Sequence, residues 1–151
     1  TRAVGIELDP VTSGAVVDQK RETSVEGIFA CGNVLHVHDL VDFVSREAEI
    51  AGKSAAKYIK NEQSDKTDIK ISCDGKVRYT VPQKITSIED TNVYFRVSDV
   101  FRNVKITVYA DGKLIKTTNK VKVAPGEMET VKLSADSLAG VKEVCIKLEE
   151  K

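Results

Sequence analysis

Tryptophan is absent from these 151 residues, and only three cysteines are present. The cysteines lie far apart and form no Cys-x-x-Cys pair, which argues against a disulfide framework and against a zinc knuckle. No apolar run approaches the roughly 18 residues of a membrane-spanning helix, and no charged-then-apolar leader opens the sequence. We therefore expect a cytoplasmic protein without a membrane span, in which Cys31, Cys73 and Cys145 are buried, reduced thiols.

Glycine is sparse as well, and its nine positions contain no Gly-x-Gly-x-x-Gly. No pyrophosphate cradle for a dinucleotide can therefore be assigned in this sequence. An excess of charge of one sign is also lacking: 23 basic side chains balance 23 acidic ones. Lysines alternate with acids along the second half, which predicts solvated strand faces and no nucleic-acid partner.

The most informative stretch runs from Thr23 to Val34 and reads Thr-Ser-Val-Glu-Gly-Ile-Phe-Ala-Cys-Gly-Asn-Val. Its apolar run at 28–30 is too short for a helix and predicts a strand buried on both faces of a parallel sheet. Gly32 and Asn33 would then lie beyond the carboxyl end of that strand, where ligands of open α/β sheets bind. The small residues there would let main chain approach a ligand closely.

This stretch resembles the second flavin-contacting motif of the FAD/NAD(P)-dependent pyridine nucleotide-disulfide oxidoreductases, in their thioredoxin-reductase-like branch. The resemblance covers about the first 60 residues and none of the rest. It implies an FAD cofactor, NAD(P)H as co-substrate, and hydride transfer to a small-molecule or protein electron acceptor. It also implies that the chain is the C-terminal part of a longer polypeptide, whose remainder would carry the adenine-binding loop, the NAD(P) domain and any redox cysteines.

The resemblance further assigns the cofactor-binding residues. Asn33 stands where the family has an aspartate, and its amide oxygen can accept a hydrogen bond from a ribityl hydroxyl of the flavin. The following helix would point its N-terminus at the pyrimidine ring, and a positive helix end there would stabilise reduced flavin. The implied cofactor-binding residues are Gly32, Asn33, Val34, Asp42, Phe43 and Val44. No catalytic residue follows from the resemblance.

Beyond this motif, apolar or small residues recur at helical spacing and predict a helix from about Leu40 to Ile59. Asp39 is the expected N-cap, and Asp42 suits the positive end of the helix dipole. The residues expected on the buried face are Leu40, Val41, Val44, Ala48, Ala51, Ala55, Tyr58 and Ile59. Arg46 and Glu47 are open to two interpretations, contact with flavin or a partner chain, and an exposed surface arrangement with Glu49.

His36 and His38 are the only histidines, and their spacing beside Asp39 leaves three interpretations open. On an extended segment the two imidazoles would share one face, but two imidazoles and a single carboxylate are too few ligands for a convincing site, so we expect no bound metal. One of them could instead donate a proton to flavin or substrate, since the loop joins the flavin-contacting turn to the helix. The third interpretation places both in solvent.

After a polar stretch at 61–67, expected to be an interdomain linker, the hydrophobic period changes from 3.6 to 2. About seven short alternating segments follow, and Asp74-Gly75 and Asp111-Gly112 read as hairpin turns. This pattern predicts an antiparallel sandwich of the immunoglobulin or fibronectin class. The lysine-rich strand at 113–122 is expected to protect a sheet edge.

The sequence thus predicts an α+β chain with two parts: residues 1–62 as the C-terminal segment of a Rossmann-like FAD-binding domain, and residues 63–151 as a β-sandwich. The functional prediction is a fragment of an FAD-dependent oxidoreductase, inactive alone. The alternative is a non-catalytic β-sandwich module for binding or assembly, with a relict flavin-domain segment. A fragmentary flavin domain exposes sheet edges and apolar faces, so we also expect self-association.

Overall fold

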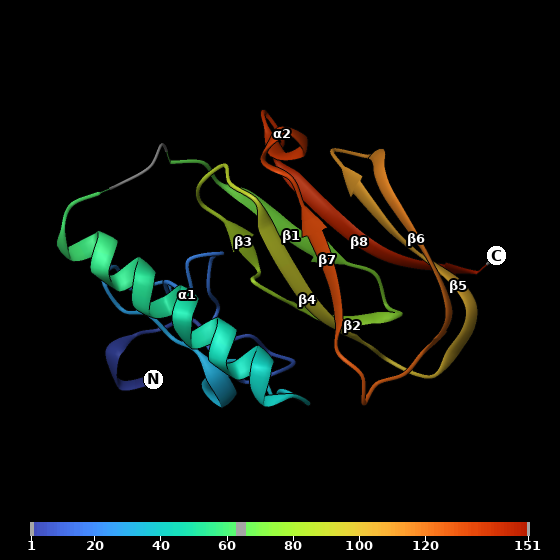
Figure 1. The fold of residues 1–151 in the computed structure, drawn as a ribbon, viewed down its shortest axis with the longest axis horizontal. Coiled ribbons are helices and arrows are strands. Elements are labelled where there is room, and N and C mark those ends of the chain that lie inside the picture. Colours follow the sequence, from blue (N-terminus) through green and yellow to red (C-terminus); the bar gives the residue numbers. More distant parts are fainter. Residues whose placement is uncertain (1, 63–65, 151) are drawn as a thin grey trace.

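The computed structural model describes residues 2–62 and 66–150, and it is a mixed α/β fold in which strands predominate. Eight strands form two sheets, with helix α1 and the N-terminal loops on one side of them (Figure 1). The strands are β1 (Ile69–Cys73), β2 (Val77–Val81), β3 (Lys84–Ile85), β4 (Thr91–Val97), β5 (Phe101–Ala110), β6 (Lys113–Val123), β7 (Glu129–Leu133) and β8 (Glu143–Glu150). The described residues contain no helix that is long and apolar enough to cross a membrane.

The two sheets pack face to face across one apolar core, as the period of 2 predicted. One sheet has the order β3-β1-β8-β5-β6, and the other has the order β2-β4-β7. All pairings are antiparallel except that of β1 with β8, which is parallel. Inward-facing side chains such as Phe95 of β4, Val108 of β5 and Ile146 of β8 are fully buried between the sheets. The lysine-rich strand β6 is a largely exposed edge strand, which confirms that prediction.

The two Asp-Gly turns have different roles. Asp111-Gly112 joins β5 to β6 in a hairpin, with φ of +46° and +81° at its two residues, as expected for a two-residue turn with both φ angles positive. The hairpin predicted at Asp74-Gly75 is wrong, because β1 and β2 belong to different sheets. There the Asp74 carboxylate accepts the N–H groups of Lys76 and Val77 and turns the chain from one sheet to the other.

Helix α1 (Val41–Ile59) confirms the predicted helix but begins and packs differently. Its N-cap is Leu40, which makes no side-chain capping bond. The predicted cap, Asp39, instead contacts Arg96 of β4 and accepts the N–H of Met128. The buried residues of the helix are Glu47 and Ala51, and the predicted buried face is wrong at Leu40, Val41, Ala48 and Ile59, which are exposed.

The loops before α1 do not form the predicted parallel strand. Phe29 makes an isolated antiparallel bridge with Glu22, and residues 28–30 are half-buried where burial on both faces was expected. Two further antiparallel bridges join Leu8 to Ala15 and Val17 to Thr23. Two short 3-10 helices complete this segment, η1 (Arg2–Val4) and η2 (Gly32–Val34). The described residues contain no neighbouring strands with which residues 28–30 could form a parallel sheet.

The N-terminal segment covers the outer face of the β2-β4 pair. Tyr79 and Val81 of β2 share a small core with Val17 and Leu35 of the N-terminal segment. On β4, Tyr94 packs edge to face on Phe43 of α1, with ring centroids 5.8 Å apart. Strand β4 is therefore buried on both of its faces. The central part of the predicted linker, residues 63–65, lies outside the described residues.

Candidate functional site

The two histidines project from an extended loop that follows η2. Leu35 is buried at the start of the loop, and Val37 between the histidines points to solvent. Side chains alternate along extended backbone, so His36 and His38 share the inner side, as their spacing predicted. Their rings lie 4.4 Å apart, and both imidazole groups are about 1% exposed. The interpretation that placed them in solvent is therefore wrong.

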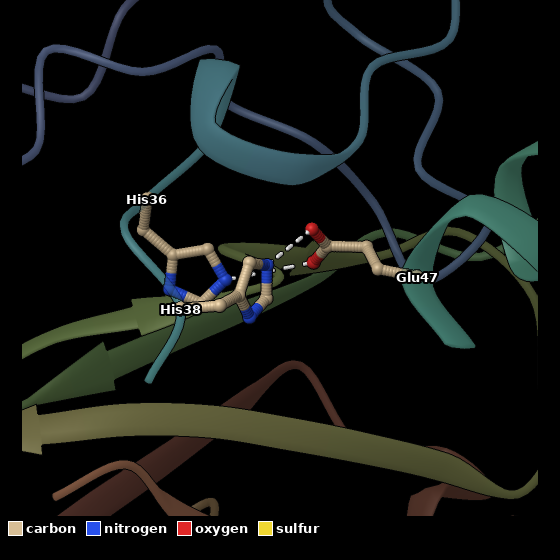
Figure 2. Close-up of side chains that lie close together, drawn as sticks. All are labelled: His36, His38 and Glu47. Atoms are coloured by element: carbon tan, nitrogen blue, oxygen red, sulfur yellow. Dashed lines mark hydrogen bonds and ion pairs between the residues drawn. The ribbon is translucent and has the colours of Figure 1, made fainter. Parts of the chain in front are cut away.

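Both rings face the carboxylate of Glu47, which comes from the second turn of α1 (Figure 2). His38 Nε2 lies 2.8 Å from Glu47 Oε2, and His36 Nε2 lies 3.5 Å from Oε1. The Glu47 side chain is 1% exposed. The sequence left open whether Arg46 and Glu47 lie on the surface. Glu47 is buried, so the surface arrangement is wrong for this residue, whereas Arg46 is exposed.

Arg21 supplies the charge that allows Glu47 to be buried. Its Nε donates to Glu47 Oε1 over 3.1 Å, and its side chain is as buried as the carboxylate. The guanidinium lies 6.0 Å from the centre of the Tyr94 ring, in range of a cation–π contact. The backbone N–H of Gly32 adds a fourth contact, donating to Glu47 Oε2 over 2.8 Å. One carboxylate therefore joins α1, the histidine loop, the 21 loop and the turn at Gly32.

These contacts determine the protonation states of the cluster. Burial alone would raise the pKa of Glu47, but His36, Arg21, His38 and the Gly32 N–H together outweigh it and lower the pKa to about 2. Burial lowers the pKa of His36, and its contact with Glu47 offsets this only in part. At neutral pH the cluster therefore contains an ionised carboxylate beside a neutral His36, whose ring can offer a nitrogen lone pair.

A second layer of contacts ties this cluster to the two-sheet core. His36 Nδ1 lies 3.3 Å from the hydroxyl of Tyr79 on β2, and Arg96 Nε on β4 donates to the same hydroxyl over 3.2 Å. Arg96 also donates to the backbone carbonyl of Val37 over 2.8 Å and pairs with Asp39. One arginine of the sheet thus holds the histidine loop at Val37 and Asp39, the residues on either side of His38.

Three polar atoms of the cluster nevertheless have no hydrogen-bond partner among residues 2–62 and 66–150. They are His36 Nε2, His38 Nδ1 and Arg21 Nη2, all buried. His36 Nε2, His38 Nε2 and one Glu47 oxygen lie within 4.8 Å of one another. Two imidazole nitrogens and a carboxylate oxygen are a ligand set that zinc and related ions accept.

The residues implied by the flavin resemblance lie at the edge of this cluster. Gly32 is buried with φ of +73°, and Asn33 and Val34 are exposed beside it. In the first turn of α1, Asp42 is exposed, whereas Phe43 and Val44 are half-buried. Val44 Cγ1 would lie 3.8 Å from a Cβ added at Gly32, so the turn and the helix start are neighbours. Cys31, expected to be buried, is half-buried, as are Cys73 and Cys145, and all three are free thiols.

A cleft of about 410 Å³ lies elsewhere, near the C-terminal end of α1. Thr23, Ser24 and Phe29 of the flavin-like motif line it, together with Tyr58 of α1 and Lys84 of β3. Neither Gly32 nor Asn33 lines this cleft. The motif therefore presents two separate surfaces, a mixed-charge cleft at its beginning and an exposed turn at its end.

Comparison of the chain with protein-family models, with curated proteins and with solved structures found no match.

Sequence reasoning identified the histidines but missed Glu47 and Arg21 as their partners. A signal for Glu47 was present in the sequence: it falls three residues after Val44 and four before Ala51, on the stripe of small and apolar residues. A carboxylate on a buried helix face needs a charged or hydrogen-bonding partner. Arg21 gave no such signal, because it lies in a loop without periodicity.

Proposed function

We propose that this chain supplies the flavin-contacting turn and helix of an FAD-dependent oxidoreductase that transfers hydride between NAD(P)H and an acceptor. The observation that carries the proposal is the buried, positive-φ Gly32 followed by an exposed Asn33, directly beside the uncapped N-terminus of α1. The resemblance of residues 23–34 to a flavin-contacting motif gives this arrangement its interpretation. The flavin would carry the redox chemistry itself.

The chemistry of the residues around the turn supports the proposal. Asn33 can accept a hydrogen bond from a ribityl hydroxyl, and the first N–H groups of α1 receive no side-chain cap. The positive end of the helix dipole favours negative charge there, as on the N1–C2=O edge of a reduced flavin. Apolar side chains at Val34, Val37, Leu40 and Val41 surround the turn and are 47–79% exposed. An isoalloxazine ring, or the protein that holds it, would cover such a surface.

The test uses the longer polypeptide that the proposal requires. Purified with its natural flanking sequence, it is expected to be yellow and to release FAD on denaturation. Asn33→Ala should lower its FAD content, because one acceptor for the ribityl chain is lost. Asn119→Ala, on the exposed edge strand β6, is the matched control and should leave the FAD content unchanged. A colourless protein that takes up no added FAD would rule the proposal out.

The alternative function is a β-sandwich module of the immunoglobulin or fibronectin class that binds or assembles without catalysis. It is favoured by the way residues 2–62 cover the outer face of β2 and β4, as a docking segment would. We expect the chain to self-associate through its exposed apolar side chains under either proposal. Light scattering on the purified chain should show a dimer or larger species, and a monomer at all concentrations would contradict it.

A further inference from the structure

We propose that His36, His38 and Glu47 form a binding site for one divalent transition-metal ion of the zinc or cobalt class. The three side chains offer two imidazole nitrogens and one carboxylate oxygen within 4.8 Å of one another, inside the protein. The site is independent of flavin, because none of its three ligands is among the residues that the resemblance assigns to the cofactor.

The spacing of the donor atoms suits a tetrahedral ion. With metal–ligand bonds of about 2.0–2.2 Å, a tetrahedral zinc ion holds its ligand atoms roughly 3.4 Å apart. His36 Nε2 is already 3.5 Å from Glu47 Oε1, and His38 Nε2 is 2.8 Å from Oε2. The two rings contact different oxygens of the carboxylate, and the three donor atoms lie within 4.8 Å of one another, so an ion must draw them together. His38 Nε2 must also give up the proton that it donates to Glu47 Oε2 before it can bind a metal. Both rings already turn toward the carboxylate (Figure 2).

An unsatisfied nitrogen points to the missing ligand. His36 Nε2 is buried, faces the carboxylate and has no hydrogen-bond partner among the described residues. Buried polar atoms are nearly always satisfied by a hydrogen bond or by a metal. A metal ion at this position would use the free lone pair of Nε2.

The surroundings provide the outer contacts that metal sites use. The second ring nitrogen of a metal-binding histidine usually donates to an oxygen, which fixes the tautomer and the ring orientation. His36 Nδ1 lies 3.3 Å from the Tyr79 hydroxyl, whose own position is fixed by Arg96 Nε at 3.2 Å. The carboxylate ligand is oriented in the same way, by Arg21 Nε on Oε1 and the Gly32 N–H on Oε2.

The ligand set and the local charge select the class of ion. Imidazole nitrogens favour zinc, cobalt, nickel and copper over magnesium and calcium, which prefer all-oxygen sites. Arg21 adds a positive charge next to the single carboxylate, so the pocket does not attract cations by charge alone. Affinity must therefore come from the two nitrogen bonds, which calcium does not form well. Three protein ligands leave one position of a tetrahedral ion for water or an anion.

Cobalt titration of the whole chain tests the site. After chelator treatment, Co²⁺ is expected to bind at one ion per chain with the visible absorption of a tetrahedral site, and Zn²⁺ should displace it. His36→Gln and His38→Gln should each weaken binding by more than about 100-fold, because each removes a direct ligand. Tyr79→Phe should weaken it by about 10-fold, because it loses only an outer contact. Glu49→Gln, exposed on the same helix, is the control and should bind as the wild type does.

Stability gives a second measurement, because Glu47→Gln leaves Arg21 unpaired and can fail to fold. Zn²⁺ should raise the melting temperature of the wild type and leave that of His38→Gln unchanged, since a ligand that binds the folded state stabilises it. The proposal is overturned if Co²⁺ does not bind, or if both histidine variants bind it like the wild type. It is equally overturned if the absorption shows thiolate ligation that Cys31→Ser abolishes.

Discussion

Glu47 is a buried carboxylate that contacts two histidines, one arginine and one backbone N–H group. Burying a charge is costly, and only several well-placed partners can offset the loss of hydration. These partners come from three separate segments outside α1, namely the loop at Arg21, the turn at Gly32 and the histidine loop, so removing the carboxylate weakens contacts across the N-terminal region. Glu49, two residues further along α1, makes an exposed ion pair with Lys53.

We therefore expect Glu47→Gln to destabilise the protein by about 3–5 kcal/mol, because Arg21 would remain buried and unpaired. Glu49→Gln should change the free energy of unfolding by less than about 1 kcal/mol, since exposed pairs contribute little. Urea unfolding followed by circular dichroism in the presence of chelator measures both. Equal effects of the two substitutions would contradict the structure.

The difference in stability between wild type and Glu47→Gln should depend on pH. The pKa of Glu47 is lowered to about 2 in the folded state, from an ordinary value of 4.5. The unfolded state therefore binds the proton first, and the stabilising contribution of the carboxylate is complete above pH 4.5 and lost as the pH falls toward 2. Urea midpoints at pH 6 and pH 3 test this. A difference that stays constant over that range would show that Glu47 titrates normally.

At the scale of the element, the two Asp-Gly turns show what local sequence can and cannot predict. Both dipeptides lie between alternating runs, and both predict a hairpin. Only Asp111-Gly112 makes one. At Asp74-Gly75 the strands separate because β3 and β8 occupy the two sides of β1, and β8 comes from the far C-terminal end of the described residues. Strand order is a long-range property, and a turn motif carries no information about it.

The glycine requirement of the two turns should differ accordingly. Gly112 has φ of +81°, and Gly112→Ala is expected to cost about 1–2 kcal/mol through backbone strain. Gly75 is not among the positive-φ glycines, and a Cβ added there would meet no atom within 4 Å. Gly75→Ala should therefore leave stability unchanged or raise it by up to about 1 kcal/mol. Chemical denaturation of the pair measures the difference, and a reversed order would refute the assigned turn geometry.

For helix α1 and the His36–His38–Glu47 cluster as well, local sequence patterns predicted the element but not its long-range contacts. Periodicity predicted the helix to within one residue of its N-terminal end, and the i, i+2 spacing predicted that both histidines share a side. Periodicity did not reveal which part of the apolar stripe is covered, because the covering groups are Tyr94 of β4 and the Arg21 loop. Asp39 was predicted as a helix cap from local rules, but Arg96 and the Met128 N–H compete for its carboxylate. Long-range partners thus override the local preference.

At the scale of the whole molecule, the smaller of the two apolar clusters contains residues from both sides of the boundary predicted near residue 62. Val17 of the N-terminal segment is fully buried, and it exchanges two hydrogen bonds with Gln83, which lies between β2 and β3. Val17 packs in one cluster with Tyr79 and Val81 of β2. Within the N-terminal segment, the backbones of Gly14 and Leu35 lie against each other, since a Cβ added at Gly14 would lie 1.9 Å from the carbonyl oxygen of Leu35. Residues 2–62 therefore form an outer layer on strands β2 and β4.

A shared core of this kind predicts that the two parts unfold together. Val17→Ala removes two buried methyl groups and should lower the free energy of unfolding by about 2 kcal/mol. The loss should be the same whether it is followed at α1 by far-ultraviolet circular dichroism or at β5 by amide hydrogen exchange, because one cooperative unit has one stability. Val121→Ala, at a 79% exposed position on β6, is the matched control and should change stability by less than about 0.5 kcal/mol. If Val17→Ala weakens the helix signal while exchange at β5 stays as in the wild type, the N-terminal layer unfolds separately from the sheets that it covers.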